Sequence, residues 1–181
     1  MTGNIAFILP LFETREMMTF VAAAPFIVVT FLMSPYSPIQ RMRGKTSEAG
    51  HGLGPVYYAM TWTVLAYIFF DHRVIIAIGI LAMSYGDGMA SLLGTRFGKQ
   101  KYHIFHDMKS YIGSIVMFVC TFLLLVVALL FYAQPVTLDV IVCLVCIAGV
   151  ATLVEGVTPF GLDNLSVPFV TVVLFWVLLV R

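Results

Sequence analysis

The chain consists of long apolar segments separated by short polar ones. Of its 181 residues, 61% are hydrophobic and 10% are charged, whereas an average soluble domain has about 25% charged residues. About six segments approach the roughly 20 apolar residues that a helix needs to cross a bilayer. They are residues 17–33, 53–70, 74–93, 112–132, 138–154 and 165–180. The sequence therefore predicts an all-α, polytopic membrane bundle that forms a single transmembrane domain over residues 1–181.

The first apolar segment of the chain is too short to span. It covers residues 4–12, and Pro10 interrupts it. We expect this segment either to lie at the membrane interface or to be the remnant of a longer helix.

The positive charges of the loops gather on one side of the predicted bundle. If all six segments span, the loops 34–52 and 95–109 share a side with the link 155–166. Positive loops mark the cytoplasmic face, so the polar segments are predicted to be cytoplasmic, with both termini outside. Because the cations are confined to two loops, we exclude nucleic-acid binding, which needs a basic face. The loop cations are Arg41, Arg43, Lys45, Arg96, Lys99, Lys101 and Lys109.

Asp87 lies late in an apolar run, where a carboxylate is costly and tends to face the bundle interior. It shares a helix face with Ser91 and Gly94, which points it inward near the cytoplasmic end. Two readings stay open, a buried acid paired with a lysine or a ligand for Mg²⁺, which takes oxygen ligands together with phosphates. The neighbouring stripe of small residues predicts close helix packing. That stripe is Ala82, Gly86, Ala90 and Gly94.

A second polar cluster surrounds the start of the next helix. Ser110 is a natural N-cap. With Lys109 before it and Gly113 in the first turn, the helix start offers N–H groups and positive charge to an anion. The preceding loop adds glycines for close backbone approach and lysines for phosphate oxygens, namely Gly94, Gly98, Lys99 and Lys101. A plain N-cap is the alternative reading.

A third cluster lies where the fifth helix breaks. Glu155 ends that helix, and glycines and a proline follow before Asp163 and Asn164. A broken helix at membrane depth is tolerated where it lines a cavity, so the two acids are candidates to complete a metal site with Asp87. In the alternative reading these polar residues only cap the last helix, which we expect for Ser166 because Pro168 follows it.

These segments together resemble a known family. GDGMASLLGTRFGKQK at 86–101, KSYIGS at 109–114 and VEGVTPFGLDNLSVP at 154–168 resemble the CTP-dependent phytol kinase and dolichol kinase group, most closely its phytol or farnesol kinase branch. The resemblance implies a membrane enzyme that transfers the terminal phosphate of CTP to an isoprenoid alcohol, such as phytol, farnesol, geranylgeraniol or a polyprenol, with Mg²⁺. Its catalytic core would be residues 84–168.

Carried onto this sequence, the resemblance implies three groups of site residues. The metal ligands would be Asp87, Glu155 and Asp163, and the catalytic residues Asp87, Lys109 and Asp163. The acid that accepts the alcohol proton would be Asp87 or Asp163. The nucleotide would be held by Gly86, Gly88, Gly94, Gly98, Lys99, Lys101, Ser110, Gly113, Ser114 and Asn164.

The chain departs from the family pattern in two ways. Relatives carry further upstream helices with an Arg-Lys and His signature, and only Glu-Thr-Arg-Glu at 13–16 stands here. Part of the lipid pocket would then be missing, reduced or supplied by a second subunit, which leaves a homo-oligomer open. Ile112 precedes Gly113, where the related membrane cytidylyltransferases usually have Glu. This favours a kinase, with a CTP:lipid-phosphate cytidylyltransferase and a small transporter or assembly subunit as alternatives.

Overall fold

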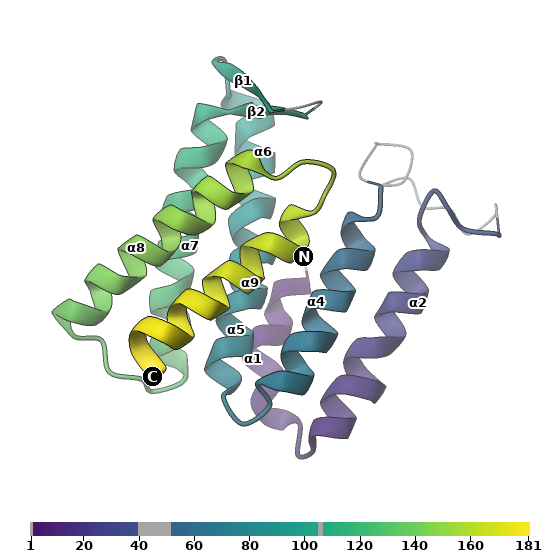
Figure 1. The fold of residues 1–181 in the computed structure, drawn as a ribbon, viewed down its shortest axis with the longest axis vertical. Helices are drawn as coiled ribbons and strands as arrows, with labels where there is room; N and C mark the ends of the chain where they lie inside the picture. Colours follow the sequence, from purple (N-terminus) through teal and green to yellow (C-terminus); the bar gives the residue numbers. More distant parts are fainter. Residues whose placement is uncertain (1, 40–51, 105–106) are drawn as a thin grey trace.

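The computed structural model describes residues 2–39, 52–104 and 107–181. All six predicted apolar segments are helical, which confirms the all-α membrane bundle (Figure 1). A π-helical stretch, Met17–Ala23, continues into α2 (Ala24–Leu32). The helices that follow are α4 (Gly54–Ile68), α5 (Arg73–Leu81), α6 (Gly88–Phe97), α7 (Tyr111–Phe131), α8 (Leu138–Val157) and α9 (Asp163–Phe175). Helix α9 ends in a π-helical turn. The predicted loop cations Arg41, Arg43 and Lys45 lie outside the described residues.

The helices differ in whether they are long enough to span. Within the described parts of the chain, four continuous helical runs are long and apolar enough to cross a bilayer: Arg73–Phe97, Tyr111–Phe131, Leu138–Val157 and Asp163–Val180. The run Met17–Leu32 is shorter. Helix α4 has 15 residues, or about 22 Å of axial length, against a hydrocarbon core of about 30 Å.

Helix α5 is the centre of the bundle. Its isoleucines and Leu81 are completely buried, and a helix that is apolar on every side belongs inside a protein or a bilayer. Gly79 lets two neighbours approach, because a Cβ there would lie 2.8 Å from Leu65 of α4 and 2.9 Å from Val172 of α9. Helix α5 continues through the π-helical turn Ala82–Asp87 into α6, so this central column carries Asp87 to the polar end of the bundle.

The small-residue stripe packs against α7, as predicted. A Cβ on Gly86 would lie 2.6 Å from the Thr121 hydroxyl oxygen, and one on Gly94 would lie 3.1 Å from the Gly113 Cα. Neither position has room for a larger side chain. The stripe thus fixes α6 against the start of α7.

The N-terminal segment, including α1 (Ile5–Ile8), packs inside the bundle. Ala6 and Leu9 are fully buried in the main core. The Tyr132 hydroxyl donates to the Ala6 carbonyl oxygen at 2.6 Å, and a Cβ on Gly3 would lie 2.4 Å from the Tyr85 ring. The segment therefore packs against α5 and the π-helical turn, which its small residues allow.

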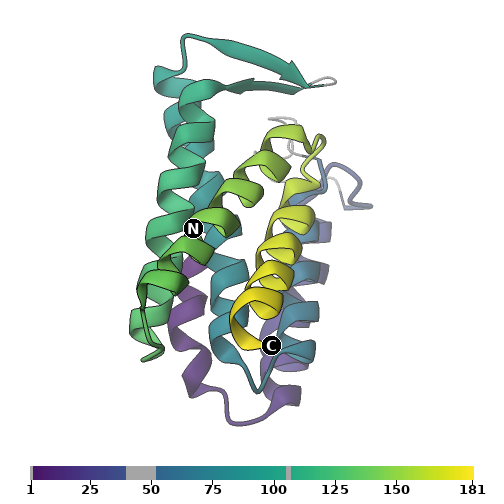
Figure 2. The ribbon, with the colours of Figure 1, turned by 60° about the vertical axis from the view of Figure 1, so that its left-hand side comes forward.

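The predicted loop 95–109 is partly a β-hairpin. Strand β1 (Lys101–Ile104) pairs antiparallel with β2 (Asp107–Ser110). An isolated two-stranded hairpin is at best marginally stable, but the Tyr102 and Ser114 hydroxyl oxygens lie 2.8 Å apart, which ties the hairpin to α7. The hairpin, the α8–α9 link and the start of α4 lie at one end of the bundle (Figures 1 and 2).

Candidate active site

Three carboxylates from distant parts of the sequence meet at this end of the bundle. Asp87 ends the π-helical turn, Glu155 lies in the last turn of α8, and Asp163 is the first residue of α9. One oxygen from each lies within 4.8 Å of the others. Glu155 is only 7% exposed. The structure therefore brings together the three acids that the sequence singled out, in an arrangement that fits a hard divalent cation.

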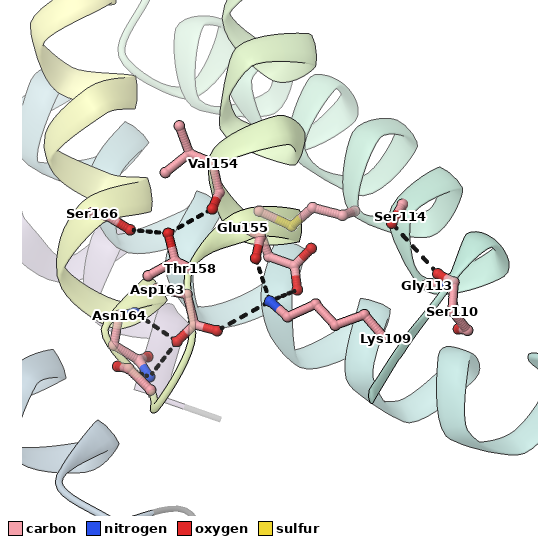
Figure 3. Close-up of polar contacts among 12 residues, drawn as sticks. Lys109, Ser110, Gly113, Ser114, Val154, Glu155, Thr158, Asp163, Asn164 and Ser166 are labelled. Atoms are coloured by element: carbon pink, nitrogen blue, oxygen red, sulfur yellow. Dashed lines mark hydrogen bonds and ion pairs between the residues drawn. The ribbon is translucent and has the colours of Figure 1, made fainter. Parts of the chain in front are cut away.

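The break between α8 and α9 positions Asp163. Phe160 and Gly161 both have positive φ, 61° and 73°, a region that residues other than glycine rarely adopt. This turn starts α9 at Asp163, whose carboxylate accepts the Asn164 backbone N–H at 2.9 Å. The predicted Ser166 cap is wrong because α9 begins earlier. The Ser166 and Thr158 hydroxyl oxygens lie 3.1 Å apart instead (Figure 3).

Lys109 reaches into the acidic cluster from strand β2 (Figure 3). Its Nζ lies 2.6 Å from Glu155 Oε1 and 3.6 Å from Asp163 Oδ2, and it also donates to the Glu155 backbone carbonyl. Burial alone would lower the pKa of Lys109, but the Glu155 and Asp163 carboxylates more than offset this and raise it. A protonated ammonium group therefore stands among the carboxyl groups.

The start of α7 has the predicted N-cap. The Ser110 hydroxyl oxygen accepts the Gly113 N–H at 3.1 Å, and the hydroxyl donates to the Gly94 carbonyl oxygen at 3.2 Å. The glycines of the preceding segment make this packing possible, since a Cβ on Gly98 would lie 2.5 Å from the Ser110 hydroxyl oxygen. Ser110 thus joins α6, the hairpin and α7 at one point.

A cavity of about 820 Å³ connects these groups. At one end it is polar, and toward α2 and α4 it becomes apolar. The size is typical of a small-molecule site. Its polar wall includes Asp87, Lys101, Lys109, Ser110, Ser114, Glu155, Asp163 and Asn164, and its apolar wall includes Ile5, Phe26, Pro55, Tyr58, Ala59 and Trp62.

Most of the predicted site residues line this cavity, and three do not. Gly88, Gly94 and Gly113 join the polar wall. Gly86 packs on Thr121, Gly98 packs on Ser110, and Lys99 is exposed on the surface. The sequence did not identify the apolar wall, because aromatic residues in a membrane helix carry no signal that separates a cavity lining from ordinary packing. Tyr102, the partner of Ser114, was also missed.

Comparisons with known proteins give one consistent group of relatives. The chain is 36% identical to the phytol kinase of Synechocystis sp. over 132 residues, which are 72% of this chain and 56% of that protein. It is 33% identical to a probable chloroplastic phytol kinase 2 of Glycine max over 177 residues, 93% of this chain and 59% of that protein. A probable chloroplastic phytol kinase of Triticum aestivum is 32% identical over 184 residues, 93% of this chain and 61% of that protein.

The chain thus spans between 56% and 61% of the length of these relatives. No protein-family model matches it. No solved structure matches it either.

Proposed function

We propose that this chain, which is homologous to the phytol kinases over most of its length, is a membrane kinase that phosphorylates an isoprenoid alcohol. The phosphate donor would be CTP, as the motif resemblance implies. The observation that carries the proposal is the cavity, which joins three clustered carboxylates and a lysine to an apolar wall. A lipid alcohol has the same two-part character, with a reacting hydroxyl group on an apolar tail.

Asp87, Glu155 and Asp163 are the residues that would hold Mg²⁺, because their carboxylate oxygens are close enough together to be shared by one ion. When bound, the ion would neutralise charge on the nucleotide phosphates. Phosphoryl transfer depends mainly on positioning and charge neutralisation, and both are tasks that a rigid cluster at helix ends can perform.

The remaining polar residues would hold the triphosphate. Lys109 supplies a point charge, and the first turn of α7, whose Gly113 lines the cavity, adds the positive end of the helix dipole. Lys101 and Ser114 line the cavity beside them. Asp87 or Asp163 would accept the proton of the alcohol as the new bond to phosphorus forms and the bond between the terminal phosphorus and the bridging oxygen breaks, leaving CDP.

The active site would face the cytoplasm. Four basic residues of the described chain lie between the last turn of α6 and the end of the hairpin, namely Arg96, Lys99, Lys101 and Lys109. Positive loops mark the cytoplasmic side. The proposal therefore has CTP entering from the cytoplasm and the alcohol from the bilayer.

The test is a screen of CTP and ATP against several isoprenoid alcohols, with purified full-length protein and Mg²⁺, that identifies both products. We expect CDP and a prenyl phosphate. Release of pyrophosphate from CTP and a lipid phosphate would instead identify a cytidylyltransferase. Folded protein that turns over none of the alcohols with either nucleotide would contradict the proposal.

A further inference from the structure

The apolar part of the cavity runs along α4. We define the apolar arm as the part lined by Phe26 and Thr30 of α2 and by Pro55, Tyr58 and Trp62 of α4. The three α4 residues recur at the spacing of one helix face. The arm begins beside the polar wall, because a Cβ on Gly54 would lie 3.2 Å from the Asn164 amide nitrogen.

Two aromatic rings, those of Phe26 and Trp62, pair in the apolar arm. The ring centroids of Phe26 and Trp62 are 5.6 Å apart, in an edge-to-face arrangement. Within the described residues, no part of α4 beyond Trp62 lines the cavity. The distance along the helix from Pro55 to Trp62 is about 10 Å. Trp62 is therefore the last residue of α4 along the arm.

Trp62 contributes a ring at this position and no hydrogen bond within the described protein. The residue is 2% exposed, and its indole nitrogen is buried without a hydrogen-bond partner among the described residues. Leaving a buried N–H group unpaired is unfavourable. A phenylalanine would avoid that cost but would fill less space. The larger volume of the indole ring is thus what tryptophan provides at this position and phenylalanine would not.

We propose that Trp62, supported by Phe26, limits the length of isoprenoid tail that the cavity accepts and so determines which alcohol is preferred. This inference rests on the proposed function, because it assumes that the hydroxyl group lies at the carboxylates and the tail in the apolar arm. A tail that ends before Trp62 fits entirely inside. A longer tail meets the indole ring and has to leave the arm toward the bilayer.

The test compares kcat/KM for farnesol and geranylgeraniol, which differ by one isoprene unit. The measured quantity is the kcat/KM for geranylgeraniol divided by the kcat/KM for farnesol. In Trp62→Ala this ratio should rise at least about tenfold over the wild-type ratio, mainly through KM. The reason is that small differences in apolar fit discriminate between substrates by about 10-fold to 200-fold. Trp62→Phe should shift the ratio in the same direction by less.

Trp176→Ala is the matched control. Trp176 contacts Phe69 and His72, with ring centroids 5.7 Å and 5.2 Å away. It starts the π-helical turn Trp176–Val180 that leads to the C-terminus, which lies at the opposite end of the bundle from the hairpin (Figure 1). Its ratio should equal that of the wild type. Because Trp62→Ala removes a core side chain, Phe26→Ala provides a second variant at a residue that is 44% exposed, and it should shift the ratio in the same direction.

The possible failures are distinguishable. An active Trp62→Phe or Phe26→Ala protein with the wild-type ratio would overturn the inference while leaving the kinase assignment in place. A wild-type protein that phosphorylates no alcohol would overturn the proposed function itself. An equal shift in Trp176→Ala would show that the ratio reports general loosening of the bundle, and would also overturn the inference.

Discussion

The two ends of the cavity are built in different ways. The polar end is formed by α6, β2, the start of α7 and the α8–α9 break, and hydrogen bonds and an ion pair hold it together. The apolar arm lies between α4 and α2, and no residue of α2 is buried. The proposed chemistry therefore lies where several elements are tied together, and the proposed tail site lies beside α2, which has no buried residue. Substitutions should affect turnover at one end and substrate choice at the other.

Replacement of Asp87 should have the largest effect. Asp87→Asn removes a charge from the carboxylate cluster and should lower kcat by at least about 1,000-fold, because phosphoryl transfer depends on charge neutralisation. The measurement is prenyl phosphate formation by folded protein. Asp139→Asn is the control, since Asp139 is an exposed acid in the first turn of α8, and it should keep wild-type turnover. Full activity in Asp87→Asn would remove Asp87 from the mechanism.

Lys109→Met should affect both stability and turnover. The substitution leaves Glu155 and Asp163 without their ammonium partner. Removing one partner of a buried ion pair lowers the free energy of unfolding by about 3–5 kcal/mol. The substitution should also lower kcat/KM for the nucleotide about 100-fold. Lys99→Met is the control, because Lys99 is exposed outside the cavity wall. Equal losses in both variants would mean that the two lysines act through the overall positive charge of this segment and not through a specific contact of Lys109.

The contribution of Lys109 should also have a defined pH dependence. Its pKa is raised above the ordinary value of 10.5 in the folded protein. Its stabilising effect is therefore fully present below that value, and is lost as the pH rises through the folded pKa. The stability difference between the wild type and Lys109→Met should therefore not shrink between about pH 7 and 9 in denaturant unfolding. A difference that shrinks within this range would contradict the assignment.

Gly94→Ala should destabilise the polar end by about 1–3 kcal/mol, the usual cost of overpacking. Its Cβ would lie 2.7 Å from the Ser110 hydroxyl oxygen and 3.1 Å from the Gly113 Cα. Gly149→Ala is the matched control in α8, where a Cβ would meet only Phe118 at 4.0 Å. The control should stabilise the protein slightly, since alanine is the better helix former. Thermal unfolding of both variants measures the difference.

Thr30→Val should have the smallest effect. Thr30 lines the apolar arm, but its hydroxyl group already donates to the Phe26 carbonyl oxygen of its own helix at 2.6 Å. The valine side chain has nearly the same shape, so KM for the alcohol should change less than about threefold. A large loss would show that this hydroxyl group binds the substrate and that the arm is not purely apolar.

The difference between the two ends also decides what the sequence could predict. Asp87, Glu155 and Asp163 stand out because acids are rare in apolar sequence, and helix breakers surround the last two. The Ser110 cap and the small-residue stripe follow from local rules. Trp62 and Phe26 are apolar residues among many others, so only the three-dimensional packing shows that they line a cavity.

Local patterns failed where tertiary contacts decided the structure. The strands of the hairpin are four residues each, too short for a periodic signal, and the Tyr102–Ser114 contact stabilises them from outside. The Ser166 cap was wrong because the positive φ angles of Phe160 and Gly161 start α9 at Asp163. The buried Ala6 is contacted by Tyr132, which lies far along the chain.

The most direct test follows the terminal phosphate of labelled CTP in a single turnover with purified protein, Mg²⁺ and farnesol. We expect the label to appear in farnesyl phosphate, CDP to form in equal amount, and Asp87→Asn to transfer no label on the same timescale. Label recovered in pyrophosphate, or transfer to lipid at the wild-type rate by Asp87→Asn, would contradict it.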